Sequence, residues 1–165
     1  MIRVGVVGAG FIGRIHAQSA HDIRIAELSG VYDKRKDVAE RVVEEFGGEV
    51  FDSYEQLLEK SDVVVLAVPT PFRGEYLEKA LRMGRHVFCE KPLARTLEEA
   101  ERIREIVRTS HSKFMVDHVV RFFPEYRKIR DSVASGKLGE ISEVRSFRGG
   151  PFPGWADWFR SFEKS

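Results

Sequence analysis

The sequence has little cysteine, little net charge and no long hydrophobic run. Its single cysteine, Cys89, excludes an intrachain disulfide framework, and its place in an apolar segment favours a buried, inert thiol. The net charge of +1, from 27 basic and 26 acidic residues that are interspersed, predicts no nucleic-acid partner. No apolar run approaches the ~20 residues of a membrane-spanning helix, and no charged, apolar leader precedes the first strand. We therefore expect a cytoplasmic protein without a membrane partner.

Apolar segments alternate with amphipathic helical patterns over residues 1–118. This alternation is typical of βαβ units, so it predicts an α/β fold with a doubly wound parallel sheet of the Rossmann type. Capping boxes at Ser53 and Thr96 each begin a helix. The expected strands are residues 2–7, 23–32, 49–51, 62–68, 86–89 and 114–116, and the expected helices are 11–20, 37–46, 53–58, 72–83 and 96–107.

The pattern changes after residue 118. A helix is expected over residues 126–133, and the alternation of apolar and polar residues over 141–147 predicts a half-exposed strand. Four aromatic residues then recur at helical spacing, and they either pack onto the first domain or contact a partner. We predict a nucleotide-binding domain over residues 1–118 and an incomplete α/β substrate domain over 119–165. The four aromatic residues are Trp155, Trp158, Phe159 and Phe162.

A glycine motif follows the first expected strand directly. Gly8, Gly10 and Gly13 form a GxGxxG pattern between a strand and a helix. Two of the glycines allow a tight turn and close approach to a pyrophosphate, the third allows close packing of helix and strand, and the helix N-terminus supplies N–H donors. We therefore expect these glycines, with Phe11 and Ile12, to bind a dinucleotide. No metal ligand is predicted.

An aspartate lies where a dinucleotide-binding domain commonly places one. Asp33 ends the second expected strand, twenty residues beyond Gly13. Its carboxylate can hydrogen-bond the adenosine ribose and repel a 2′-phosphate, which favours NAD over NADP. The alternative is that Asp33 is a helix N-cap. Lys34 and Arg35 follow and could cradle a 2′-phosphate, so NADP stays an alternative cofactor.

The tripeptide Glu90-Lys91-Pro92 follows the expected strand 86–89. Ligands of open parallel sheets bind beyond the carboxyl ends of the strands, so Lys91 is expected near the reactive end of a cofactor. An ammonium group there can stabilise a developing alkoxide or transfer a proton. The alternative is an ordinary surface lysine in a loop.

Three motifs occur in an order and spacing that resemble a known family. They are Gly8 to Gly13, the run from Ala80 to Pro92, and Arg121-Phe122-Phe123-Pro124 with the segment Ser135 to Ile141. Together they resemble the N-terminal part of the glucose–fructose oxidoreductase / inositol 2-dehydrogenase (Gfo/Idh/MocA) family over the whole chain. The Glu-Lys-Pro tripeptide after a Gly-x-His-Val strand is more specific than the glycine loop.

The resemblance implies an NAD(P)-dependent oxidation or reduction of a sugar or polyol hydroxyl. It implies that Lys91 is catalytic, binds the substrate hydroxyl and takes part in its proton transfer. Glu90 and Pro92 would shape the nicotinamide pocket, and Pro69 and Thr70 would line the cofactor. The family's C-terminal domain covers the substrate and makes oligomer contacts, so a homo-oligomer, or a partner covering residues 141–162, is expected.

The sequence departs from the family pattern in three places. The loop after the central strand reads Thr-Pro-Phe-Arg at residues 70–73, where members often have a histidine. A polar residue commonly precedes the Arg-Phe motif, whereas here His118 lies one place further back and is either a substrate ligand or a structural histidine. The motif with the second catalytic residue is not reached by Ser165. We therefore expect either an oxidoreductase that is incomplete as this chain or an inactive dinucleotide-binding module or regulator.

Overall fold

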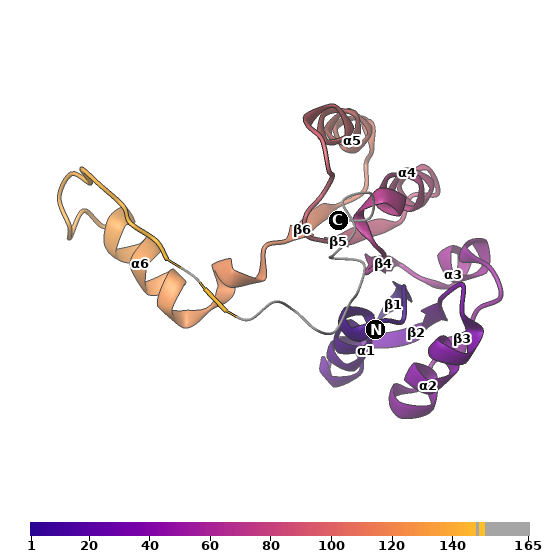
Figure 1. Ribbon diagram of the computed structural model, residues 1–165. Helices are drawn as coiled ribbons and strands as arrows, with labels where there is room; N and C mark the ends of the chain where they lie inside the picture. The colour runs from indigo at the N-terminus through magenta and orange to yellow at the C-terminus, as the bar shows by residue number, and fades with distance from the viewer. Residues whose placement is uncertain (148, 151–165) are drawn as a thin grey trace. The chain divides into compact units, whose positions relative to one another are not determined.

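A computed structural model describes residues 1–147, 149 and 150 of the chain (Figure 1). The described residues fall into two compact units, which divide between Asp117 and His118. The aromatic residues at positions 155–162, and any partner contact they make, lie outside the described residues.

The first unit is built on a six-stranded parallel sheet. The strand order is β3-β2-β1-β4-β5-β6, so the chain builds outward from β1 in one direction and then in the other. Loops that follow β1 and β4 therefore diverge at the carboxyl edge, which is where ligands of such sheets bind. The strands are β1 (Ile2–Val7), β2 (Ala26–Tyr32), β3 (Glu49–Val50), β4 (Val63–Leu66), β5 (His86–Glu90) and β6 (Phe114–Asp117).

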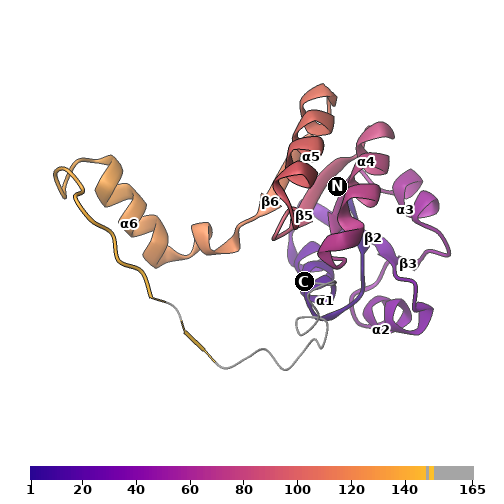
Figure 2. The same cartoon turned by 45° about the horizontal axis from the view of Figure 1, so that its top comes forward.

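Helices cover both faces of this sheet, as Figures 1 and 2 show. Val6 and Val65 pack into a core with α1 and α2, whereas their neighbours Val7 and Leu66 pack into a second core with α3, α4 and α5. Consecutive strand residues point to opposite faces, so each of these central strands places apolar side chains in both cores. The doubly wound α/β prediction is confirmed. The helices are α1 (Phe11–Asp22), α2 (Lys36–Phe46), α3 (Tyr54–Lys60), α4 (Arg73–Arg82) and α5 (Leu97–Thr109).

Side-chain caps mark the start of two helices. Ser53 and Thr96 cap α3 and α5, each hydroxyl accepting the N–H of the residue three places on. The second strand begins at Ala26 rather than residue 23, because the Ala26 N–H donates to the Ile23 carbonyl in a turn. The helix expected from residue 72 begins at Arg73, and a short 3₁₀ helix (Thr70–Phe72) precedes it. Cys89 is fully buried, as expected.

The second unit holds a 3₁₀ helix (Val119–Phe122) and α6 (Pro124–Ala134), which begins with proline at its first position. The expected strand over residues 141–147 is wrong, because this segment has neither strand nor helix geometry. A strand needs a neighbouring backbone for its hydrogen bonds, and nothing in the described part of the chain pairs with it. Among all the residues that the structure describes, no helix is long and apolar enough to cross a membrane.

Candidate cofactor and active site

The glycine loop joins β1 to α1, and its three glycines differ in what surrounds them. Gly8 has a φ of +91°, and a Cβ there would lie 2.8 Å from the Ala67 carbonyl oxygen. A Cβ on Gly13 would collide with the Gly8 carbonyl oxygen, so this glycine lets α1 pack onto the loop. A Cβ on Gly10 would meet nothing within 4 Å. Gly10 therefore faces open space, as a glycine approached by a ligand must.

The N-terminus of α1 is not neutralised by its own residues. Gly10 is the N-cap and makes no side-chain capping bond, and the first turn contains no acidic residue. Phe11 and Ile12 are the first two helical residues, the former exposed and the latter half-buried. The positive end of the helix dipole therefore stays available to an anion such as a pyrophosphate.

The Asp33 carboxylate joins the glycine loop to the loop after β2. One oxygen accepts the Ala9 N–H at 2.7 Å and the other accepts the Arg35 N–H at 2.8 Å. The N-cap of α2 is Arg35, so the alternative that Asp33 caps this helix is wrong. A carboxylate has about four lone-pair sites. Half-buried Asp33 therefore keeps acceptor capacity for ribose hydroxyls.

The loop after β4 contains a buried polar group without a partner. Thr70 is 3% exposed, and its Oγ1 has no hydrogen-bond partner in the part of the chain that the structure describes. Pro69 beside it is half-buried. A buried hydroxyl left unpaired costs about 1–3 kcal/mol. Such an atom at the carboxyl edge fits a ligand that brings its own polar group, as a dinucleotide does.

Glu90, Lys91 and Pro92 leave the carboxyl end of β5. Glu90 is 8% exposed, and its Oε2 accepts the Lys91 backbone N–H at 3.1 Å. The side chains of Lys91 and Pro92 are exposed, and the peptide bond between them is cis. The structure thus holds the Lys91 backbone against a buried carboxylate while its side chain stays open to solvent.

Two side chains near Glu90 were not identified by sequence reasoning. His16, from α1, places Nε2 2.9 Å from Glu90 Oε1 and 3.9 Å from Asp117 Oδ2. Asp117 ends β6 and is the register partner of Glu90. That pairing of polar residues at the ends of adjacent strands was the available signal for Asp117. His16 had no such signal, because its contact depends on how α1 packs.

The charges of this cluster influence one another. Burial alone would raise the pKa of Glu90, but hydrogen bonds and charge from His16 and Lys91 outweigh it and lower that pKa. Burial and the nearby Glu90 carboxylate raise the pKa of Asp117. The ligating atoms of His16, Glu90 and Asp117 lie within 4.8 Å of one another and could hold a metal ion. His16 and Glu90 are hydrogen-bonded to each other without an ion, and the absence of a metal stays a prediction.

A buried arginine lies beneath the same loop. Arg73, the first residue of α4, is 4% exposed. Its Nε donates to the Val68 carbonyl at 2.9 Å, and one of its terminal nitrogens donates to the Glu90 carbonyl at 2.8 Å and to the Pro92 carbonyl. Burial lowers the pKa of the guanidinium. Sequence reasoning noticed the segment 70–73 as a departure but assigned Arg73 no role.

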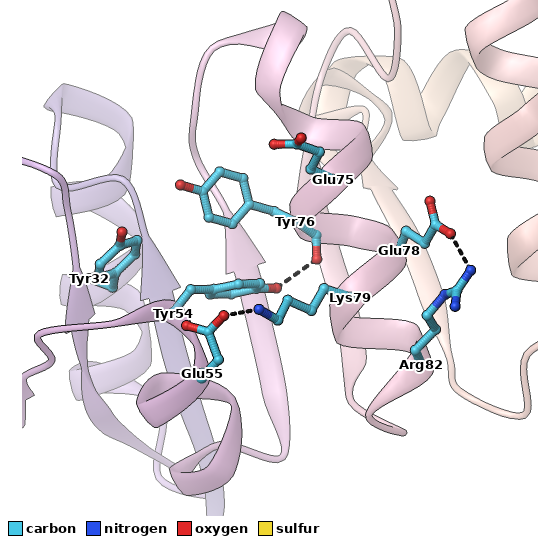
Figure 3. Close-up of a pocket in the computed structure, with 8 residues that line it drawn as sticks. All are labelled: Tyr32, Tyr54, Glu55, Glu75, Tyr76, Glu78, Lys79 and Arg82. Carbon is cyan, nitrogen blue, oxygen red and sulfur yellow. Dashed lines mark hydrogen bonds and ion pairs between the residues drawn. The ribbon is translucent and has the colours of Figure 1, made fainter.

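A separate pocket lies where α3 and α4 approach each other near the end of β2 (Figure 3). Its walls are held by the Tyr54 hydroxyl, which donates to the Tyr76 carbonyl at 2.7 Å, and by an ion pair between Lys79 and Glu55. None of the predicted site residues lines it. The pocket therefore gives no support to the candidate site. Its lining residues are Tyr32, Tyr54, Glu55, Glu75, Tyr76, Glu78, Lys79 and Arg82.

The remaining candidate, His118, begins the second unit and is exposed. Its carbonyl accepts the Arg121 N–H at 2.9 Å in the turn that starts the 3₁₀ helix. Its assignment to the substrate stays a prediction.

Comparison with known proteins identifies the family. The Gfo/Idh/MocA model, described as an oxidoreductase family with an NAD-binding Rossmann fold, matches residues 2–118. The chain belongs to this family. It is 36% identical over 149 residues to the dTDP-3,4-didehydro-2,6-dideoxy-alpha-D-glucose 3-reductase of Actinomadura kijaniata, covering 88% of this chain and 44% of that protein.

Two solved structures of Gfo/Idh/MocA relatives are similar to this one. Scyllo-inositol dehydrogenase from Lactobacillus casei, with bound NAD(H) and scyllo-inositol, has a TM-score of 0.81 at 30% identity, over 86% of this chain and 43% of that one. KijD10, a 3-ketoreductase from Actinomadura kijaniata in complex with NADP, has a TM-score of 0.75 at 33% identity, over 85% and 46%. The chain thus spans less than half the length of the relatives that it matches.

Proposed function

We propose that this Gfo/Idh/MocA chain binds a nicotinamide dinucleotide along the carboxyl edge of its sheet. The bond from the Ala9 N–H to the Asp33 carboxylate carries this proposal, because it joins the predicted phosphate loop to the predicted ribose ligand. Open space at Gly10 and the unpaired Thr70 hydroxyl support it. Phosphates would lie at the N-terminus of α1, and the ribose at Asp33.

NAD is the proposed cofactor and NADP the alternative. The Asp33 carboxylate would repel a 2′-phosphate. Lys34, which could attract one, places its ammonium 5.3 Å from the centre of the Phe72 ring. The relatives point both ways, since one solved structure contains NAD(H) and another NADP.

The proposed reaction is hydride transfer between the nicotinamide and a sugar or polyol hydroxyl, in a protein of which this chain is the cofactor-binding part. The bound cofactor supplies the hydride chemistry. Lys91 extends from the loop after β5, and we assign its ammonium to binding the substrate hydroxyl and transferring that hydroxyl's proton. Glu90 and Pro92 would shape the nicotinamide pocket. Pro69 and Thr70 would line the cofactor.

The chain has two parts in this proposal. Residues 1–118 form the dinucleotide-binding domain, and residues 119–165 begin the substrate and oligomerisation domain of a cytoplasmic homo-oligomer. The alternative is a binding module or regulator without turnover.

Calorimetry on two alanine variants tests cofactor binding. Neither Gly10 nor Gly74 has an atom within 4 Å of an added Cβ, and neither has a positive φ, so alanine is accommodated at both. We expect Gly10→Ala to weaken NADH binding by about tenfold or more, because the methyl group occupies the space of the pyrophosphate. Gly74→Ala, in α4, is the matched control and should leave the affinity unchanged. Absence of heat with both NADH and NADPH at millimolar concentration, or equal weakening by both variants, would overturn the proposal.

A further inference from the structure

The Arg73 side chain is buried, but its donors are directed at backbone carbonyls. Nε and one terminal nitrogen together bind three carbonyl oxygens, those of Val68, Glu90 and Pro92. Burying a guanidinium is costly unless its hydrogen bonds are satisfied, and its fixed, planar fork suits several acceptors at once. An apolar side chain would fill the same space but would remove these three hydrogen bonds.

The carbonyls that Arg73 binds lie on both sides of Lys91. Glu90 precedes Lys91 and Pro92 follows it, and a single nitrogen of the guanidinium donates to both. The Lys91 N–H is fixed separately by Glu90 Oε2. The backbone around Lys91 is therefore held at three polar groups, two of which depend on Arg73.

Arg73 also joins this loop to the one that carries Thr70. Val68, whose carbonyl accepts from Nε, lies two residues before Thr70. The charged and titratable groups that act on the guanidinium are Glu90 and Cys89, both on β5. Glu90 is itself held from the opposite side by His16. One buried cation thus links the start of α4 to the loops after β4 and β5.

We propose that Arg73 is a positioning residue, which fixes the backbone on both sides of Lys91 and so sets the geometry of the nicotinamide end of the site. This inference rests on the proposed dinucleotide binding. Arg73 does not touch the cofactor in this scheme. It acts through the Glu90 and Pro92 carbonyls.

The first test compares two ligands. NADH reaches the Lys91 loop, whereas ADP-ribose shares its adenosine, pyrophosphate and ribose but lacks the nicotinamide. For Arg73→Met in the 165-residue chain, we expect NADH affinity to fall by about tenfold, with ADP-ribose affinity unchanged. Arg73→Lys, which keeps the charge but loses the fork, should lie between wild type and Arg73→Met. Arg102→Met is the control, because Arg102 is an exposed arginine of α5, and it should alter neither affinity.

The second test needs no ligand. The backbone amide of Lys91 should shift in the ¹H–¹⁵N spectrum of both Arg73 variants, whereas the amide of Arg14, bonded to the Gly10 carbonyl, should not. An equal loss of affinity for NADH and ADP-ribose would show a general structural role and overturn the inference. An unchanged chemical shift of the Lys91 amide would also overturn it. If wild type binds neither ligand, the proposed function fails, and the Lys91 amide still decides whether Arg73 fixes this loop. If Arg73→Met does not fold, Arg73→Lys provides both measurements.

Discussion

The two units of the chain use similar helices to different effect. In the first unit α4 buries Leu77, Ala80 and Leu81 against the sheet. In the second unit α6 has the same kind of apolar spacing, yet none of its residues is buried, and Ile129 is 59% exposed. An amphipathic pattern therefore predicts that a helix forms. It does not predict what the helix packs against, and most helix stability comes from that packing.

The largest difference between the units should appear on truncation of one apolar residue in each helix. Leu77→Ala removes a side chain with no exposed surface, and we expect the free energy of unfolding to fall by about 2–5 kcal/mol. Ile129→Ala in α6 should change it by less than about 0.5 kcal/mol. Urea denaturation of both variants measures this. Equal losses would show that α6 is buried in solution.

A smaller effect separates packing from ligand binding within the first unit. Gly13→Ala places a methyl group on the Gly8 carbonyl, so we expect the free energy of unfolding to fall by about 1–3 kcal/mol, together with loss of NADH affinity. Gly10→Ala should lose affinity alone. Thermal melts and calorimetry on the same samples distinguish the two. A Gly13→Ala chain as stable as Gly10→Ala would contradict the assigned packing role.

The smallest effect concerns ion pairs. Arg3 and Asp62 join β1 to the residue before β4, 59 positions apart in the chain, whereas the ion pairs within residues 118–147 join residues one or two places apart. Hydrogen bonds from the Arg3 side chain and backbone lower the pKa of Asp62 from 3.8 to about 2. Stability from this pair is therefore present above pH 3.8 and is lost as the pH falls toward 2.

NMR titration of the Asp62 carboxyl measures this shift. In Arg3→Met we expect its pKa to move up toward 3.8, although the backbone N–H of residue 3 keeps part of the shift. At neutral pH the variant should lose little stability, because both side chains are partly exposed to solvent. Arg130→Met, which breaks a pair between adjacent residues, is the control. A pKa of about 2 retained in Arg3→Met would show that the side-chain bonds are not its cause.

Sequence reasoning succeeded where the signal was local. The turn from β1 through Gly8–Gly13 into α1 follows from adjacent residues, and so do the caps at Ser53 and Thr96. It failed at residues 141–147, where the alternation was present but a strand also needs a neighbour supplied from elsewhere. The neighbouring backbone that a strand needs for its hydrogen bonds cannot be predicted from the strand's own residues.

The candidate site shows the same contrast between residues with a local signal and residues whose partners are distant in the chain. Position along the chain was enough to nominate Asp33 and Lys91, because each follows a strand at the edge where ligands bind. His16 was missed because its partner Glu90 lies 74 residues away. The role of Arg73 was missed because its partners are carbonyls, and every residue type has one.

The unpaired Thr70 hydroxyl lowers the stability of the fold but offers a hydrogen-bonding group to a ligand. Valine has nearly the same shape and no hydroxyl, so it would remove the penalty of a buried unsatisfied group and also remove the contact offered to a ligand. Selection of this chain for heat resistance alone, without cofactor present, would therefore favour variants that have lost the Thr70 hydroxyl and its contact with the cofactor. A screen that includes the dinucleotide would retain the threonine.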